Sequence, residues 1–304
     1  MPDPTPDVTT RATLLGLGAV LLWTSLASLT ALAGPIPPFQ MSAMTFAIGS
    51  AVGVLWSLVR GQPLGSLMTI RPASLALGIY GLLLFHVCYF IALRLAPVIE
   101  ASLIIYLWPL LIVLFSGLLP SGLGGHGLGW LHIGGALLGL AGSALILSDG
   151  ILSDGGQWRA FGDGQALGYL MAAAAAFVWA SYSVASRLLR DVPSNAVTVN
   201  CAATATGALG LHVIFETTVW PGSVAAWLAI VALGFGPVGL AFYLWDEGMK
   251  RGNMRLLGVA SYATPLLSTL LLRSLGIGSA SASLWLAALL ITAGAVLGSR
   301  ERSN

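Results

Sequence analysis

The chain carries one short motif twice, and each copy lies inside an apolar stretch of about twenty residues. The motif occupies Tyr106–Pro109 (YLWP) and Tyr262–Pro265 (YATP), which stand 156 residues apart. Trp23 and Trp179 repeat the same spacing in two earlier apolar stretches. Hydrophobic segments copied in two halves, with a proline inside corresponding segments, are typical of membrane transporters built from internal repeats.

Composition places this chain in a lipid environment. Of its 304 residues 57% are hydrophobic and only 8% are charged, with a mean hydropathy of +0.90. A soluble protein has roughly 25% charged residues, so the expected solvent of this surface is the lipid bilayer. The net charge of +2 gives no reason to expect a nucleic acid partner. Cys88 and Cys201 both lie in apolar runs, without the spacing of a metal site or a disulfide.

Ten stretches are long and apolar enough for transmembrane helices, which need about 20 residues each. A membrane β-barrel is excluded because these runs are continuous and do not alternate. The predicted spans are 12–33, 40–59, 73–95, 97–119, 128–148, 164–187, 195–216, 223–246, 254–274 and 282–299.

The two halves are predicted to be inverted repeats. Residues 1–148 form the first five-helix repeat, 149–163 an extracytoplasmic connection, and 164–304 the second repeat. Five spans per half make corresponding spans cross in opposite senses. With the N-terminus in the cytoplasm, all but three of the 13 basic residues fall on the cytoplasmic side, so both termini are predicted to be cytoplasmic. The expected fold is an all-α integral membrane protein with ten helices around a central cavity.

The mid-span prolines are the first indication of a binding site. Pro109 and Pro265 each remove a backbone donor and should kink their helices at equivalent depth. Tyr106 and Tyr262 precede them by three residues, and a hydroxyl at this depth is best placed in a cavity wall. A kink that serves packing alone is the competing interpretation. Trp108 adjoins the bend and faces either the cavity or lipid.

Further candidates come from polar and aromatic stripes on other spans. His86 is the one histidine well inside a span, and it shares a helical face with Tyr89. A neutral histidine that hydrogen-bonds between helices is an equally good interpretation. Trp179 and Tyr182 begin a stripe that should face protein or water, and Tyr243 is paired with Tyr89 at a spacing of 154. Trp23 holds the corresponding place in the first span.

Several classes of function are disfavoured by what the sequence lacks. No carboxylate falls at mid-membrane, where a proton antiporter of the small multidrug type needs one. Metalloprotease, serine hydrolase and phosphate-loop motifs are missing, so we expect no enzyme, no catalytic residue, no metal and no cofactor. No Arg or Lys lies at mid-span, which disfavours a carrier of sugar phosphates.

Together these features resemble the EamA-type drug/metabolite transporter superfamily. The resemblance rests on the ten spans, the tryptophans Trp23 and Trp179, and Pro109 and Pro265, and it covers nearly the whole chain. Tyr89, the Tyr106–Pro109 segment and Trp179 are similar to the bacterial aromatic amino acid exporter branch. The resemblance implies a basket of helices around a central cavity, and export of small metabolites across a bacterial inner membrane.

The sequence-based hypothesis is a secondary transporter for small solutes such as aromatic amino acids. Aromatic rings would stack on the solute, and an ammonium group above a ring gains about 0.5–2 kcal/mol. Facilitated diffusion by alternating access is the first expectation, and proton coupling through His86 the second. A polyspecific, proton-coupled drug or metabolite exporter and a membrane binding protein that does not transport remain alternatives. A monomer or weak homo-oligomer is expected.

Overall fold

The computed structural model describes residues 6–61, 63, 65, 71–96, 98–123, 129–153, 164–274 and 282–299. Throughout these ranges the regular structure is helical and no strand occurs, which confirms the all-α prediction. In chain order the elements are α1 (Pro6–Trp23), α2 (Leu26–Ala33), α3 (Pro38–Val59), α5 (Pro72–Gly78), η1 (Ile79–Leu84), α6 (Phe85–Leu95), α7 (Val98–Ile105), α8 (Trp108–Ser116), η2 (Ser121–Leu123), α9 (Trp130–Ser153), α10 (Gln165–Ala185), η3 (Ser186–Leu189), α11 (Ala196–Phe215), α12 (Val224–Phe235), η4 (Gly236–Leu240), α13 (Ala241–Arg251), α14 (Met254–Ala260), α15 (Ala263–Ser274) and α16 (Ala282–Ser299).

Within the described ranges, six helical segments are long and apolar enough to cross a membrane, so this is a multi-pass membrane protein. They are α1–α2, α3, α5–η1–α6, α10–η3, α11 and α12–η4–α13. The other four predicted spans coincide with the broken helices α7–α8 and α14–α15 and with α9 and α16. Helix α9 continues to Ser153, so it takes up the start of the predicted connection 149–163. The rest of that connection, 154–163, lies outside the described residues.

The spans that contain Pro109 and Pro265 break where a kink is predicted from the sequence. Helix α7 ends at Ile105 and α8 begins at Trp108, while α14 ends at Ala260 and α15 begins at Ala263. The turns between them place each proline in the first turn of the next helix, where no backbone donor is required. Each span is therefore two short helices joined at mid-length.

Two other spans share a different irregularity. A π-helical segment, η1 or η4, interrupts α5–α6 and α12–α13. The helices that follow, α6 and α13, have 11 residues each and begin 156 residues apart, at Phe85 and Ala241. This register pairs Tyr89 with Trp245, whereas the sequence analysis paired Tyr89 with Tyr243.

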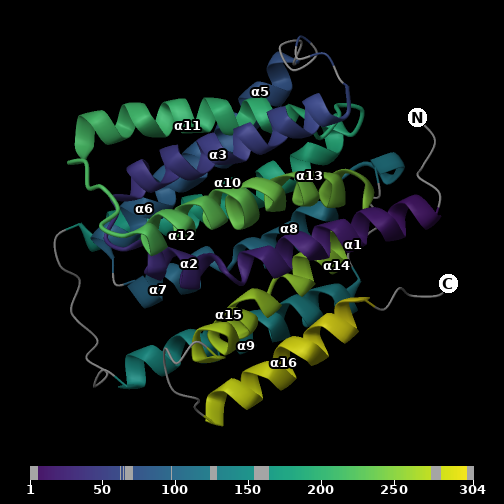
Figure 1. Cartoon of the computed structure of the whole chain (residues 1–304). Coiled ribbons are helices and arrows are strands. Elements are labelled where there is room, and N and C mark those ends of the chain that lie inside the picture. Colours follow the sequence, from purple (N-terminus) through teal and green to yellow (C-terminus); the bar gives the residue numbers. More distant parts are fainter. Residues whose placement is uncertain are drawn as a thin grey trace.

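The helices run roughly along one direction in a layered bundle (Figure 1). Helix α11 packs on α3 at one side of the bundle, and α9 packs on α16 at the opposite side. Between these pairs, α1 packs on α13, and α10 packs on α6 and α8. The start of α1 and the end of α16 lie at the same end of the bundle (Figure 1).

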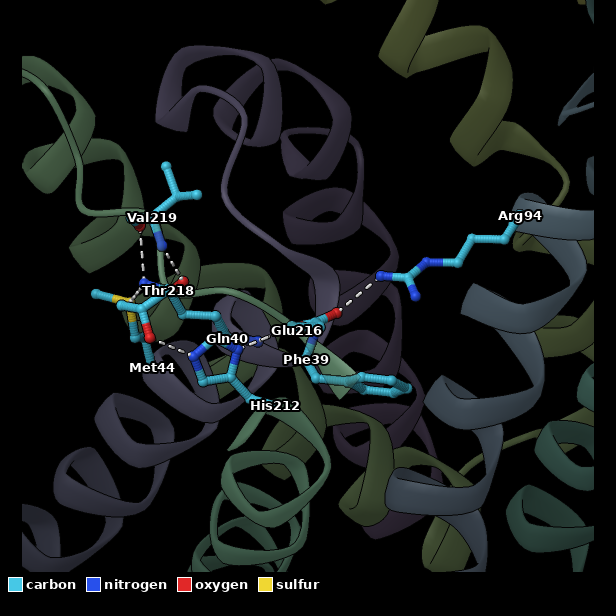
Figure 2. Close-up of polar contacts among 8 residues, drawn as sticks. All are labelled: Phe39, Gln40, Met44, Arg94, His212, Glu216, Thr218 and Val219. Carbon is cyan, nitrogen blue, oxygen red and sulfur yellow. Dashed lines mark hydrogen bonds and ion pairs between the residues drawn. The ribbon is translucent and has the colours of Figure 1, made fainter. Parts of the chain in front are cut away.

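A buried carboxylate joins three spans (Figure 2) where α11 ends, at the end of the bundle opposite the chain termini (Figure 1). The Glu216 side chain is only 2% exposed and accepts the backbone N–H groups of Phe39 and Gln40 at 3.1 Å. These are orphan donors of the first turn of α3, and the helix dipole favours an anion there. Arg94 from α6 and His212 from α11 each lie 3.0 Å from a carboxylate oxygen. We call this end of the bundle the Glu216 end.

The other end is held together by Arg187. Its guanidinium donates to the carbonyl oxygens of Leu123, Met249 and Gly252 at 3.3, 3.0 and 2.8 Å. The connection that follows α8 and the end of α13 therefore meet on one side chain. We call this end, which also holds the start of α1, the Arg187 end.

Candidate functional site

Four tryptophans from four spans meet in the interior of the bundle. They are Trp23 at the end of α1, Trp108 at the start of α8, Trp179 in α10 and Trp245 in α13. The Trp23 ring centroid lies 5.0 Å from Trp245, 5.7 Å from Trp179 and 6.3 Å from Trp108. Most pairs meet edge to face, the arrangement that the aromatic quadrupole favours. We call this group the tryptophan cluster.

Local backbone breaks place two members of the cluster. Trp23 is the last residue of α1, and its Nε1 donates to the Pro237 carbonyl of η4 at 3.0 Å. The proline break makes Trp108 the first residue of α8. Trp108 is therefore buried among the other tryptophans and does not lie on the outer surface.

Trp245 was not among the site residues predicted from the sequence. It is 1% exposed, and its Nε1 donates to Ser183 Oγ of α10 at 3.1 Å. Phe242, Trp245 and Met249 are all buried and spaced three and four residues apart, which marks one helical face. That spacing, together with the 156-residue offset from Tyr89, is the signal that could have identified it.

The aromatic side chains of α6 extend the cluster. Phe85 lies 5.3 Å from Trp179 and 5.7 Å from Tyr89, measured between ring centroids. His86 stands one ring further out, 5.0 Å from Phe46 and 5.1 Å from Phe85. Its Nδ1 donates to the Leu82 carbonyl at 2.7 Å, since a carbonyl oxygen can only accept. His86 thus bonds within its own helix, rather than between helices as the sequence analysis considered.

Two tyrosine hydroxyls beside the cluster are available for a solute. Tyr89 and Tyr106 are half-buried, and within the described ranges neither hydroxyl has a hydrogen-bond partner. Tyr106 sits in the turn between α7 and α8, within electrostatic range of Tyr89. A phenolic hydroxyl in a mostly apolar protein interior gains from a polar partner. A bound polar solute can supply that partner.

The remaining predicted site residues lie at the edge of the cluster or away from it. Tyr182 is 5.5 Å from Trp179, but its ring packs on the backbone at Gly81. The Tyr243 hydroxyl turns to the other side of α13, where it donates to the Gly49 carbonyl or to Thr198 Oγ1, both at 3.1 Å. Tyr262 belongs to a second core formed by residues of α8, α9, α14, α15 and α16.

The prolines act on the site through the backbone. Pro109 is buried in the first turn of α8, beside Trp108, and Pro265 is buried in the first turn of α15.

A cavity of about 730 Å³ opens elsewhere, between α5–η1–α6 and α11. None of the predicted site residues lines this cavity.

The fold defines a polytopic helical membrane protein with a cluster of aromatic side chains in its interior, and comparisons with known proteins specify its family. The EamA-like transporter family matches residues 10–148 and 166–300. The chain belongs to this family, and it is accordingly a transporter of the bacterial inner membrane and no enzyme.

Similar proteins agree with this assignment. The chain is 49% identical over 290 residues to the aromatic amino acid exporter YddG of Ancylobacter novellus, covering 94% of this chain and 96% of that protein. It is 29% identical to the proteins of the same name from Salmonella typhimurium and Escherichia coli, with the same coverage. One solved crystal structure matches with a TM-score of 0.87 at 48% identity, over 95% of this chain and 97% of that one.

Proposed function

We propose that this transporter exports aromatic amino acids by alternating access. The high identity to a protein named for that activity supports the substrate class, over nearly the full length of both chains. In this proposal residues 1–148 and 164–304 are inverted five-helix repeats around a central cavity. The equal length and the 156-residue offset of α6 and α13 support the repeat.

The observation that carries the proposal is the tryptophan cluster with its two unpaired hydroxyls. The aromatic ring of a solute would stack against Trp108, Trp179 and Phe85, with contacts that an aliphatic side chain cannot reproduce. The solute's ammonium group would lie over a ring face, and its polar atoms would meet the Tyr89 and Tyr106 hydroxyls. Trp245 would form the floor beneath the rings.

Orientation is proposed from charge. Among the described residues, the Arg187 end includes Arg187, Arg190, Lys250 and Arg251, while the Glu216 end includes Arg94 and, near the end of α15, Arg273. Cytoplasmic segments are enriched in Lys and Arg, so we place the Arg187 end in the cytoplasm with both termini. Labelling of single cysteines at the two ends in intact cells would test this placement.

The proposed mechanism of export is facilitated diffusion without coupling to protons. The one histidine of the site, His86, is separated from the tryptophan cluster by Phe85 and is bonded to its own helix. It is therefore poorly placed to exchange a proton with a solute. Proteoliposomes with and without a pH gradient separate the two modes, because proton coupling would drive uphill flux that His86→Ala abolishes.

Counterflow of labelled phenylalanine in proteoliposomes tests the function itself. We expect Trp108→Ala to raise the half-saturating concentration roughly two- to thirtyfold, the range for losing about 0.5–2 kcal/mol of ring contact. Trp130→Ala serves as the matched control, since Trp130 is 79% exposed at the start of α9. Equal flux in both variants would move the site elsewhere, and no counterflow in the unmodified protein would reject the substrate class.

A further inference from the structure

Trp23 and Trp179 stand at equivalent positions, 156 residues apart, but their helices differ. Helix α1 ends at Trp23, and the chain turns at Thr24 and Ser25 before α2 begins. Helix α10 continues unbroken from Trp179 to Ala185. The two halves of the chain therefore hold the same residue in two different conformations of the surrounding span.

The hydrogen bonds of the two indoles differ in the same way. Trp23 Nε1 donates to the Pro237 carbonyl of η4 at 3.0 Å, and this bond joins the first half of the chain to the second. The residue equivalent to Pro237, 156 positions earlier, is Gly81 in η1. Within the described ranges the indole N–H of Trp179 has no hydrogen-bond partner, so the corresponding bond to Gly81 is absent.

The surroundings of Gly81 explain why that bond is absent. A Cβ placed on Gly81 would lie 2.1 Å from the ring of Tyr182, so this ring covers the η1 backbone. The Tyr80 hydroxyl of η1 also bonds Ser181 Oγ of α10 at 2.7 Å. Together these contacts hold the unbroken α10 flat against η1. For Trp179 to reach Gly81, α10 would have to shift along η1, as α1 is displaced at its break beside η4.

We infer that the two indole–carbonyl hydrogen bonds alternate during transport. The Trp23–Pro237 bond belongs to the state described here, and a Trp179–Gly81 bond replaces it in the oppositely open state. In a protein with inverted repeats, exchanging the conformations of the two halves converts one state into the other. Segments of π-helix suit this role because such segments frequently occur at functional sites. The inference rests on the proposed inverted repeat and alternating access.

The test measures populations of the two states without any solute. Spin-label pairs at Leu32 and Leu95 report the Glu216 end, and pairs at Leu118 and Leu188 report the Arg187 end; these four side chains are exposed. The labels are placed in the full-length protein in nanodiscs, after both native cysteines are replaced by alanine. Distances are then measured by pulsed electron resonance.

Trp23→Phe keeps an aromatic ring but removes the N–H donor. It should lower the ratio of the described state to the opposite state about two- to tenfold, the effect of one net hydrogen bond. Adding Trp179→Phe should return the populations toward those of the unmodified protein, since the opposite state then loses its own bond. A double variant that moves further away from the unmodified protein would overturn the inference.

Trp245→Phe is the matched control. It removes an indole N–H bond of similar length, 3.1 Å to Ser183, but both residues belong to the second half. If Trp245→Phe shifts the populations of the two states as much as Trp23→Phe does, the shift reflects a general loosening of the cluster and contradicts the inference. Tyr80→Phe gives an independent check if Trp179→Phe does not fold, because loss of the Tyr80–Ser181 bond should move the populations in the same direction as Trp23→Phe.

Because no solute is present, the populations can respond as expected even if phenylalanine proves not to be a substrate. Conversely, phenylalanine counterflow with no change of populations in Trp23→Phe would leave the proposed function intact and reject the alternation.

Discussion

Tyr106 and Tyr262 occupy the same place in two equally broken helices, but their surroundings are opposite. Tyr106 is half-buried beside the tryptophan cluster, and its hydroxyl has no partner within the described ranges. Tyr262 is 0% exposed, packs against Gly139 of α9, and accepts the Leu110 N–H of α8 at 3.1 Å. The hydroxyl of one tyrosine is unpaired within the described ranges, and the hydroxyl of the other holds the first break in place by accepting a backbone N–H.

Residues at equivalent positions in the two halves of the chain therefore do not have equivalent roles. Helices α9 and α16 lie over the second break and enclose Tyr262 in a core of their own. At the first break Tyr106 is only half-buried, and its hydroxyl has no partner within the described ranges. Substitutions at these two positions should therefore separate stability from transport.

The largest effect on stability is expected for Tyr262→Ala. Deleting a fully buried aromatic ring typically costs roughly 3–5 kcal/mol, because the cavity collapses only in part. Tyr106→Ala removes fewer contacts and should destabilise much less, while weakening phenylalanine transport more. Unfolding in detergent and counterflow measure the two effects. Equal losses of stability would show that both tyrosines are structural.

Gly139→Ala should cause a smaller loss of stability, because the added methyl group would press against the Tyr262 ring. The added Cβ would lie 2.4 Å from Tyr262 Cδ2, and overpacking of this kind costs about 1–3 kcal/mol. Gly134→Ala on the same helix is the matched control, since its Cβ would meet Leu297 at an ordinary 3.5 Å. A melting temperature that falls for Gly139→Ala alone would support the close packing of α9 on Tyr262.

The smallest pair of effects comes from removing only the hydroxyls. Tyr262→Phe leaves the Leu110 N–H without its acceptor and should destabilise by roughly 1–3 kcal/mol at most. Tyr106→Phe should leave the unfolding free energy unchanged, and weaken solute binding by about 0.5–1.5 kcal/mol, or two- to tenfold. If Tyr106→Phe transports normally, its hydroxyl does not contact the solute.

Much of the fold could be predicted because its signals are local. Long apolar runs predict membrane helices, and Pro109 and Pro265 break them wherever they pack, since a missing backbone donor acts within one turn. The π-helical segments were not predicted, and each packs against helices that are distant in the sequence. Gly81, for example, is covered by the Tyr182 ring from α10.

The site was predicted only in part, for a reason that Tyr243 illustrates. Tyr89 and Tyr243 were paired by residue type, but the helix boundaries pair Tyr89 with Trp245. Two residues along a helix correspond to about 200° of rotation, so this error moves the chosen side chain to the opposite face. The predicted residues Trp23, Trp108, Trp179 and Tyr89 do come together, whereas Tyr243 and Tyr262 face elsewhere.

By itself, the sequence determined that this chain lies in a membrane as helices and where the helices break, because hydropathy and backbone chemistry act over short segments. Only the tertiary structure decided which aromatic side chains meet, which hydroxyls stay unpaired, and that Trp23 and Trp179 differ. Those properties depend on contacts between residues as far apart as Trp23 and Pro237, and packing against neighbouring helices sets them.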